Sequence, residues 1–160
     1  MKRLQSFGRL SLIIVLFSSF GAIELAHGID GTAYRGDPPD ILWEKTLGGT
    51  SYDSAYDVIE TLDGGYCIAA SSQSYGGRKA LLIKTDSDGN QLWLQTYLVD
   101  TMAYAHGIEQ TTDGGFILAG HDYSASRSWD VYLIKTDVDG VVEWEKTFGG
   151  TDLDYGYSVQ

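Results

Sequence analysis

The sequence predicts an all-β protein built from four-stranded antiparallel sheets, and three observations support this fold class. A segment of about fifty residues occurs more than once along the chain. Each copy contains four short, largely apolar runs of strand length. Asp-Gly turns join these runs, and Asp-Gly supplies the positive φ angles that a tight hairpin needs. Such short links favour antiparallel pairing in chain order, so each copy is predicted to be a four-stranded meander.

The repeat is marked by three landmarks that keep their order and spacing. They are a segment that begins with Trp, an Asp-Gly-Gly turn before an aromatic residue, and an Ile-Lys-Thr-Asp segment that leads into an Asp-Gly turn. In chain order their copies begin at Trp43, Trp93 and Trp144, at Asp63 and Asp113, and at Ile83 and Ile134. The offset is 50 residues from Asp63 to Asp113 and 51 from Ile83 to Ile134. We therefore place a one-residue insertion in a loop near residues 125–129.

The strands follow from the apolar runs between these turns. The predicted strands of the first copy are residues 54–61, 66–72, 80–85 and 91–98, and those of the second copy are residues 104–111, 116–122, 130–136 and 142–148. A leading strand is expected at Ile41–Leu47, because this segment matches the closing strand of each copy. The residues after Thr151 match the start of the first copy, so a third copy is predicted to begin at about residue 152.

The burial pattern of the middle strands predicts how the meanders are arranged. Residues 66–70 and 80–83, and their counterparts 116–120 and 131–134, are apolar without alternation. A strand that is apolar on both sides must be covered on both faces. Four-stranded sheets stacked around an axis meet this need, which predicts a β-propeller. A β-sandwich and a solenoid are the alternatives, but a sandwich does not require a repeat with the same turns each time.

Domain boundaries follow from the start of the chain and from the repeat. Residues 1–28 have the basic start, apolar run and small-residue cleavage site of a secretory signal peptide, with cleavage expected after Gly28. The alternative is an uncleaved membrane anchor, although the apolar run is short for a bilayer span of roughly 20 residues. Residues 29–40 are expected to be a linker, and residues 41–160 to be propeller repeats with blades at about 51–98 and 102–148. Because propellers have about 4–8 blades, we expect a longer native protein whose remaining blades complete the ring.

Charge and cysteine content exclude several classes of partner. The chain has a formal net charge of −11. Residues 1–28 hold three basic groups and one acidic group, so removing them leaves 8 Lys+Arg and 21 Asp+Glu, a net charge of −13. Such a field repels nucleic acid and anionic lipid, and no second apolar stretch is long enough to span a membrane. The acidity attracts cations or a basic partner, or serves only solubility. Cys67 is the one cysteine, so no internal disulfide can form.

The Asp-x-Asp-Gly turns are the candidate metal sites. They resemble the start of a calcium loop, so calcium is the one cofactor for which the sequence offers ligands. The candidates are Asp86, Asp88, Asp137 and Asp139. A complete loop pattern requires a third Asp or Asn and a distant Glu, and both are absent here. We therefore expect hairpin turns in which the Asp side chains cap the backbone.

The aromatic residues are the candidate ligand contacts. Trp129 lies near the insertion and has no repeat counterpart, so it is the better ligand candidate, together with Tyr123 and Arg127. The tryptophans that recur with the repeat are expected to be wedges between blades rather than sugar-stacking platforms. Residues expected to be structural parts of the repeat are Trp43, Trp93, Trp144 and the turn glycines Gly64, Gly65, Gly89, Gly114, Gly115 and Gly140.

Other residues with potential chemistry have structural explanations. His106 aligns with Tyr56 and Tyr157, and His121 aligns with Ser71, so neither histidine has the repeated acidic or thiol partner of a metal site. Cys67 aligns with Ile117 and is expected to be a core thiol. Lys84 and Lys135 recur with the fold and are expected to pair with carboxylates. No nucleophile-elbow motif or catalytic triad can be argued, so no catalytic residue is assigned.

The repeat also resembles a known family. Thr85-Asp86-x-x-Gly89-x-x-x-Trp93, with the Asp-Gly-Gly-aromatic turn and the Trp-x-x-Thr-x-Gly-Gly closing strand, resembles the repeat of the quinoprotein-like (PQQ-like, or WD40-like) β-propellers of secreted bacterial and archaeal proteins. The resemblance covers about residues 41–160. It implies a propeller fold, but propellers carry many unrelated functions. Quinoprotein enzymes of this kind hold a quinone with calcium, a catalytic Asp and often a vicinal disulfide, and the single cysteine here departs from that pattern.

The expected function is therefore a secreted, extracellular or cell-surface propeller that serves as a non-catalytic scaffold or binding module. Its ligand would be an extracellular protein or a glycan. The alternative is a fragment of a propeller enzyme, either a quinoprotein-like oxidoreductase or a glycan-active enzyme, with its active site in other blades. A large surface protein with a C-terminal anchor or an adhesion module, of which this chain would be a part, is a third expectation.

Overall fold

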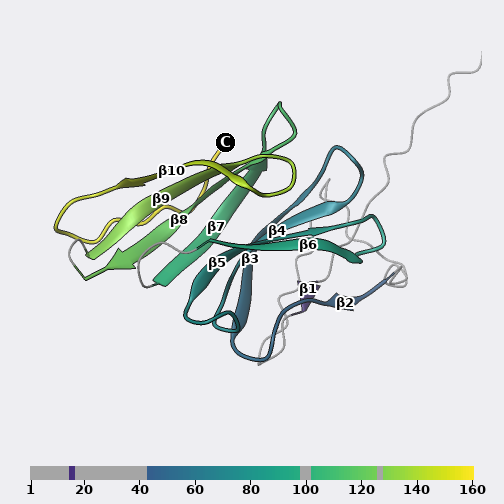
Figure 1. The fold of residues 1–160 in the computed structure, drawn as a ribbon, viewed down its shortest axis with the longest axis horizontal. Coiled ribbons are helices and arrows are strands. Elements are labelled where there is room, and N and C mark those ends of the chain that lie inside the picture. The colour runs from purple at the N-terminus through teal and green to yellow at the C-terminus, as the bar shows by residue number, and fades with distance from the viewer. Residues whose placement is uncertain (1–14, 17–42, 98–101, 126–127) are drawn as a thin grey trace, which may run out of the picture.

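The computed structural model describes residues 15–16, 43–97, 102–125 and 128–160, and these residues are all-β, without a helix. Two four-stranded antiparallel meanders make up most of the structure (Figure 1). The first sheet has the order β3 (Asp53–Glu60), β4 (Tyr66–Ser72), β5 (Lys79–Thr85) and β6 (Gln91–Tyr97). The second sheet is formed by β7 (Met102–Gln110), β8 (Phe116–Ser124), β9 (Ser128–Thr136) and β10 (Val142–Phe148). All eight predicted strands are present.

The strands differ from the prediction mainly at the loop between β8 and β9. We predicted ends at residues 122 and 130, but pairing continues through Tyr123↔Trp129 to Ser124↔Ser128. Trp129 therefore lies in a strand and not in a loop. Its carbonyl accepts a hydrogen bond from Asp154 N (2.8 Å), just as the carbonyl of Arg78 accepts one from Ala103 N (3.0 Å). Trp129 thus has a positional counterpart in the first copy of the repeat, Arg78. Alignment of the two copies by sequence did not reveal this correspondence.

The leading strand is shorter than predicted within the described residues. It consists of β2 (Lys45–Thr46), which pairs in parallel with β1 (Val15–Leu16). β1 lies inside the segment predicted to be a signal peptide. Ile41, the linker at 29–40 and the rest of the predicted signal peptide lie outside the described residues.

The two sheets pack against each other, and their shared layer is the core. Strand β7 lies against β3, β4 and β5 (Figure 1). The packed layer combines small and large apolar side chains from both sheets, in keeping with the apolar runs in the sequence. Its buried members include Cys67, Ala69 and Leu82 from the first sheet and Phe116, Leu118 and Ile134 from the second.

The turn chemistry that the sequence predicted also recurs in both sheets. Gly64 and Gly114 have φ angles of 81° and 86°, the left-handed region that glycine adopts at low cost. The next glycine of each turn is needed for a different reason. A Cβ on Gly65 would collide with the carbonyl oxygen of Thr85, and one on Gly115 would collide with that of Thr136. Each Asp-Gly-Gly turn therefore fixes both the hairpin and its close approach to the third strand.

Residues 152–160 continue the repeat in space. Asp154 Oδ2 accepts a hydrogen bond from Gly150 N (3.2 Å), as Asp53 Oδ2 does from Gly49 N (2.8 Å). A Cβ on Gly107 would lie 2.9 Å from Ser158 Cα, so this segment passes closely over β7. It thus lies against the second sheet much as the start of β7 lies against the first.

Candidate functional site

The repeat-locked tryptophans join each closing segment to the sheet that follows it. The Trp43 ring lies 5.8 Å from the Tyr66 ring, and the Trp93 ring lies 6.0 Å from the Phe116 ring, centroid to centroid. The same rings cover the turn glycines, because a Cβ on Gly89 would meet Trp43 at 2.7 Å and a Cβ on Gly140 would meet Trp93 at 3.0 Å. Trp43 and Trp93 thus each pack against a ring and a turn glycine. We call this contact the tryptophan interlock.

Hydrogen bonds add to the tryptophan interlock between Trp93 and the second sheet. The Tyr97 hydroxyl donates to the Gly140 carbonyl (2.7 Å), and Gln95 Nε2 donates to the Asp139 carbonyl (3.3 Å). Burial raises the pKa of Tyr97, so its hydroxyl stays protonated and remains a donor. The β6 strand therefore contacts the Asp-x-Asp-Gly turn of the second sheet through an aromatic ring, a phenol and an amide.

Two of the four candidate calcium ligands, Asp86 and Asp137, use their carboxylates within their own turns. Asp86 Oδ1 accepts hydrogen bonds from Asp88 N (2.9 Å) and Asn90 N (2.8 Å). Asp137 Oδ1 accepts from Asp139 N (3.0 Å) and Val141 N (2.8 Å). The side-chain hydrogen bond from Asn90 is the main cause that lowers the pKa of Asp86. Among the described residues, no group of three or more His, Cys, Asp and Glu side chains is placed to hold a metal ion.

The recurrent lysines pair with the turn carboxylates. Lys84 Nζ lies 2.8 Å from Asp63 Oδ2, and Lys135 Nζ lies 2.9 Å from Asp113 Oδ2. The hydrogen bond from Lys84, followed by that from Thr61, lowers the pKa of Asp63 to about 2. In the second sheet, hydrogen bonds from Thr111 and then from Lys135 lower the pKa of Asp113 in the same way. These ion pairs tie the Asp-Gly-Gly turn to the third strand of each sheet, which is a structural role.

Cys67 is fully buried in the layer between the sheets. Burial raises the pKa of its thiol to about 12, so the thiol stays protonated at physiological pH. This is the inert core thiol that we expected and not a nucleophile.

A cluster of aromatic rings and imidazoles lies at the end of the second sheet where β7 begins and β8 ends. We call it the aromatic–histidine cluster. Its members are Tyr56, Tyr104, His106, His121, Tyr123, Trp129, Tyr155 and Tyr157. They come from β3, β7, β8, β9 and the 152–160 segment, so the fold brings together residues that are far apart in sequence.

The two histidines are at the centre of this cluster. Their ring centroids lie 4.7 Å apart with the planes 30° from parallel. His121 also contacts Tyr104 at 4.9 Å, Tyr155 at 4.8 Å and Trp129 at 5.1 Å. Burial, and then the neighbouring His106, lowers the pKa of His121 to about 4, and burial also lowers the pKa of His106. Both imidazoles are therefore neutral at pH 7, and neutral imidazoles can stack without repulsion.

The structure places two of the three predicted ligand contacts in this cluster. The Tyr123 and Trp129 rings are cross-strand neighbours with centroids 5.2 Å apart. Arg127 lies outside the described residues. Sequence reasoning did not identify His106 and His121 as parts of one cluster, although the alignment of Tyr56, His106 and Tyr157 at one repeat position was already a signal.

No model of a protein family matches the chain, and no curated protein matches it. The described part of the chain contains no helix with the length and apolar character needed to cross a membrane.

Proposed function

We propose that the chain forms blades of a β-propeller that acts outside the cell as a non-catalytic scaffold or binding module for a protein or glycan. The observation that carries this proposal is the difference between two equivalent strands. Tyr97 at the end of β6 is 5% exposed, whereas Phe148 at the same place in β10 is 50% exposed. The second sheet thus presents to solvent a surface that the first sheet buries.

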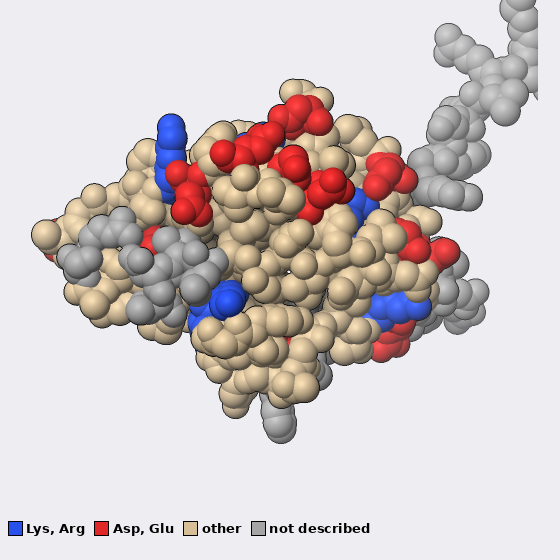
Figure 2. All heavy atoms as spheres, viewed as in Figure 1, with Lys and Arg blue, Asp and Glu red and all other residues tan. Residues whose placement is uncertain are grey.

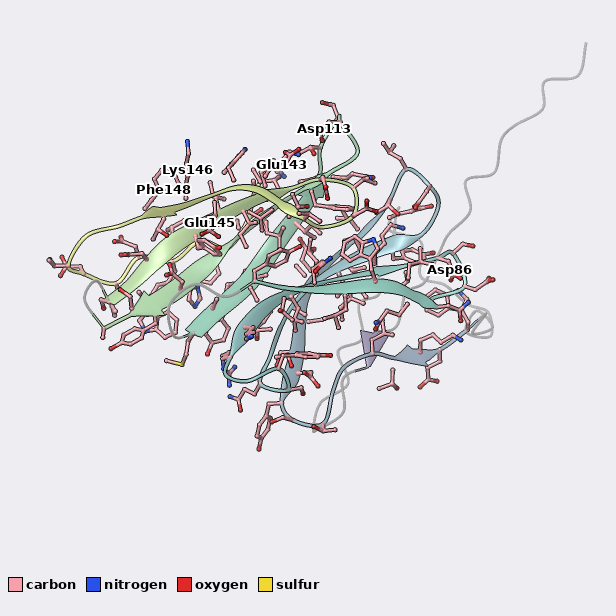
Figure 3. The ribbon with its side chains drawn as sticks, in the orientation of Figure 1. Asp86, Asp113, Glu143, Glu145, Lys146 and Phe148 are labelled. Atoms are coloured by element: carbon pink, nitrogen blue, oxygen red, sulfur yellow. The ribbon has the colours of Figure 1, made fainter. Side chains whose placement is uncertain are left out.

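The exposed surface of β10 carries Trp144 at the repeat position of the interlock tryptophans, but within the described residues no following sheet packs on it. Trp144 occupies the repeat position of Trp93 and is 40% exposed. Its described contact is with Lys146, whose Nζ lies 5.5 Å from the ring centroid. Figure 3 labels Lys146 and Phe148 along β10, the last strand of the second sheet. Exposed apolar surface on an edge strand is usually covered in a native protein. A further sheet of the same kind would cover it as β7–β10 covers the first sheet.

The surface charge fits an extracellular binding scaffold. Figure 2 shows acidic side chains spread along one side of the visible face, with fewer basic ones. This agrees with the net charge of −11 and disfavours a nucleic-acid partner. The catalytic alternative has no comparable support, because the described carboxylates with lowered pKa values lie in turns with structural partners.

The proposal predicts that the exposed β10 surface acts as an interface. When no further repeat covers it, we expect the purified chain to associate with a second copy through this surface. Sedimentation velocity over a range of about 1–100 µM should show this association. Trp144→Lys should weaken it at least ~10-fold, since a charge would replace the central ring. Val138→Lys, in an exposed turn, is the matched control, because Val138 is 56% exposed and lies outside β10. A chain that stays monomeric, or equal effects of the two substitutions, would contradict the proposal.

The extracellular location has its own test. It is supported by the layout of residues 1–28, which is typical of a signal peptide. Mass spectrometry of protein exported by a bacterial host is expected to show a mature chain that begins at Ile29. An intact N-terminus on membrane-associated protein would instead favour an uncleaved anchor.

A further inference from the structure

We propose that the aromatic–histidine cluster is a binding site for an uncharged oligosaccharide, with Tyr56, His106, His121 and Tyr157 as its contact residues. The inference rests on the proposed function, since it names the ligand class and the site of that binding module. Four features support it: a repeated bulge, buried nitrogens without partners, contact residues that bond to no described carboxylate, and exposed ring faces.

The bulge recurs at the same place in the first strand of each sheet. In the first sheet the register passes from Ala55↔Ala70 to Asp57↔Ala69, which leaves Tyr56 as the extra residue. In the second it passes from Ala105↔Gly120 to Gly107↔Ala119, which leaves His106. A bulge bends its strand and changes the direction of a side chain, and bulges are frequent beside functional sites.

The bulged residues bring their rings together across the two sheets. The centroids of Tyr56 and His106 lie 4.4 Å apart, and those of His106 and Tyr157 lie 5.3 Å apart. Tyr157 is the residue of the 152–160 segment that aligns with both bulged positions. The three rings therefore form a row that passes from one repeat to the next, at interplanar angles of 70° and 49°.

Two ring nitrogens in the cluster are buried without a hydrogen-bond partner. They are Nε2 of His106 and Nδ1 of His121, and the whole His121 residue is only 8% exposed. A buried polar atom that lacks a partner costs free energy, and its presence in a native structure calls for an explanation. A neutral imidazole has one donor and one acceptor nitrogen. A ligand hydroxyl, which can also donate or accept, would satisfy either atom.

The charge around these residues favours a neutral ligand. Within the described part of the chain, no carboxylate bonds to His106, His121 or Tyr157, whereas a site for a cation usually includes one. Arg78 lies over the Tyr104 ring with its guanidinium carbon 5.0 Å from the centroid, so the cluster already holds a cation of its own. The acidic chain disfavours an anion. A sugar combines apolar ring faces with hydroxyls, which matches aromatic walls with few polar atoms.

Two of the four contact residues are accessible, whereas His121 is buried. Tyr56 is 40% exposed and Tyr157 is 65% exposed. Tyr56 and His106 lie on β3 and β7, which are the terminal strands of their sheets. A further sheet stacked on the face of β7–β10 would not add a strand beside β3 or β7, so the site and the proposed sheet interface can coexist.

Isothermal titration of the whole chain with cellohexaose and with xylohexaose at pH 7.5 tests the inference. We expect at least one of these neutral oligosaccharides to bind with a Kd of about 1 mM or tighter. Tyr157→Ala should weaken binding at least ~10-fold because it removes an exposed ring. His121→Phe keeps a ring but removes both nitrogens, and it should weaken binding at least ~5-fold. Tyr52→Ala is the matched control, because Tyr52 is 67% exposed and lies outside the cluster.

Two outcomes would overturn the inference. One is the absence of binding to either oligosaccharide at about 10 mM by a chain whose near-ultraviolet circular dichroism shows fixed aromatic packing. The other is binding that Tyr157→Ala and Tyr52→Ala weaken equally. Trp144→Lys is expected to leave oligosaccharide binding unchanged. If binding fails while association through β10 persists, the sugar site is wrong and the scaffold proposal stands.

Discussion

At the residue scale, the stacked pair of His106 and His121 is the feature with the clearest consequence for stability. The pair is packed among tyrosines and a tryptophan, and the pKa of each imidazole is lowered by burial. Protonation would put like charges on rings 4.7 Å apart. Because the unfolded chain has an ordinary histidine pKa near 6.5, it binds more protons than the folded chain between that pH and the folded pKa. Folding stability must therefore rise with pH in that range.

We predict that the free energy of unfolding falls as the pH is lowered from 7 to 4.5. For His121, whose folded pKa is about 4, the loss should reach roughly 2–3 kcal/mol at pH 4.5 and is complete only below the folded pKa. Urea denaturation at pH 7, 5.5 and 4.5 measures this loss, with His121→Phe as the comparison. The variant should lose clearly less stability over the same pH interval. Equal losses in the two proteins would show that His121 titrates normally in the folded state.

At the element scale, the strands were predictable because local chemistry determines them. Turn glycines such as Gly64 and Gly114 require positive φ, and the apolar runs between turns have strand length. The extent of β8 and β9 was not predictable in this way. Tyr123 and Trp129 pair across the two strands near the expected loop, and no periodic pattern marks how far the paired strands continue into that loop.

The aromatic–histidine cluster was less predictable than the strands that carry it. Trp129 was identified because no tryptophan stands at an equivalent place in the repeat, and Tyr123 because it lies near Trp129 in the sequence. His121 was not identified as a member of the cluster. Its ring contacts Trp129 in β9 and Tyr155 and Tyr157 in the 152–160 segment, and only the fold brings these residues together. The bulge at His106 also leaves no mark in hydrophobic periodicity. Only the shared repeat position of Tyr56, His106 and Tyr157 was visible in the sequence, and its meaning depends on the packing of successive repeats.

At the scale of the whole molecule, the structure repeats one contact. The tryptophan interlock joins Trp43 to Tyr66 and Gly89, and the same contact joins Trp93 to the second sheet. The 152–160 segment continues the series over β7–β10. This repetition explains why strands that are apolar on both sides are stable here, since each sheet is covered by its neighbours. It also explains why β10 remains largely exposed.

The central claim is that the interlock holds successive sheets together and that, among the described residues, Trp144 has the same position with no following sheet packed on its ring. The most direct test compares the free energies of unfolding of Trp93→Ala and Trp144→Ala by urea denaturation of the monomer at pH 7.5. We predict that Trp93→Ala destabilises the chain by about 2–4 kcal/mol, because it removes a ring packed on Phe116 and Gly140. Trp144→Ala should cost less than about 1 kcal/mol, since its ring is 40% exposed. Equal costs for the two substitutions would contradict the account.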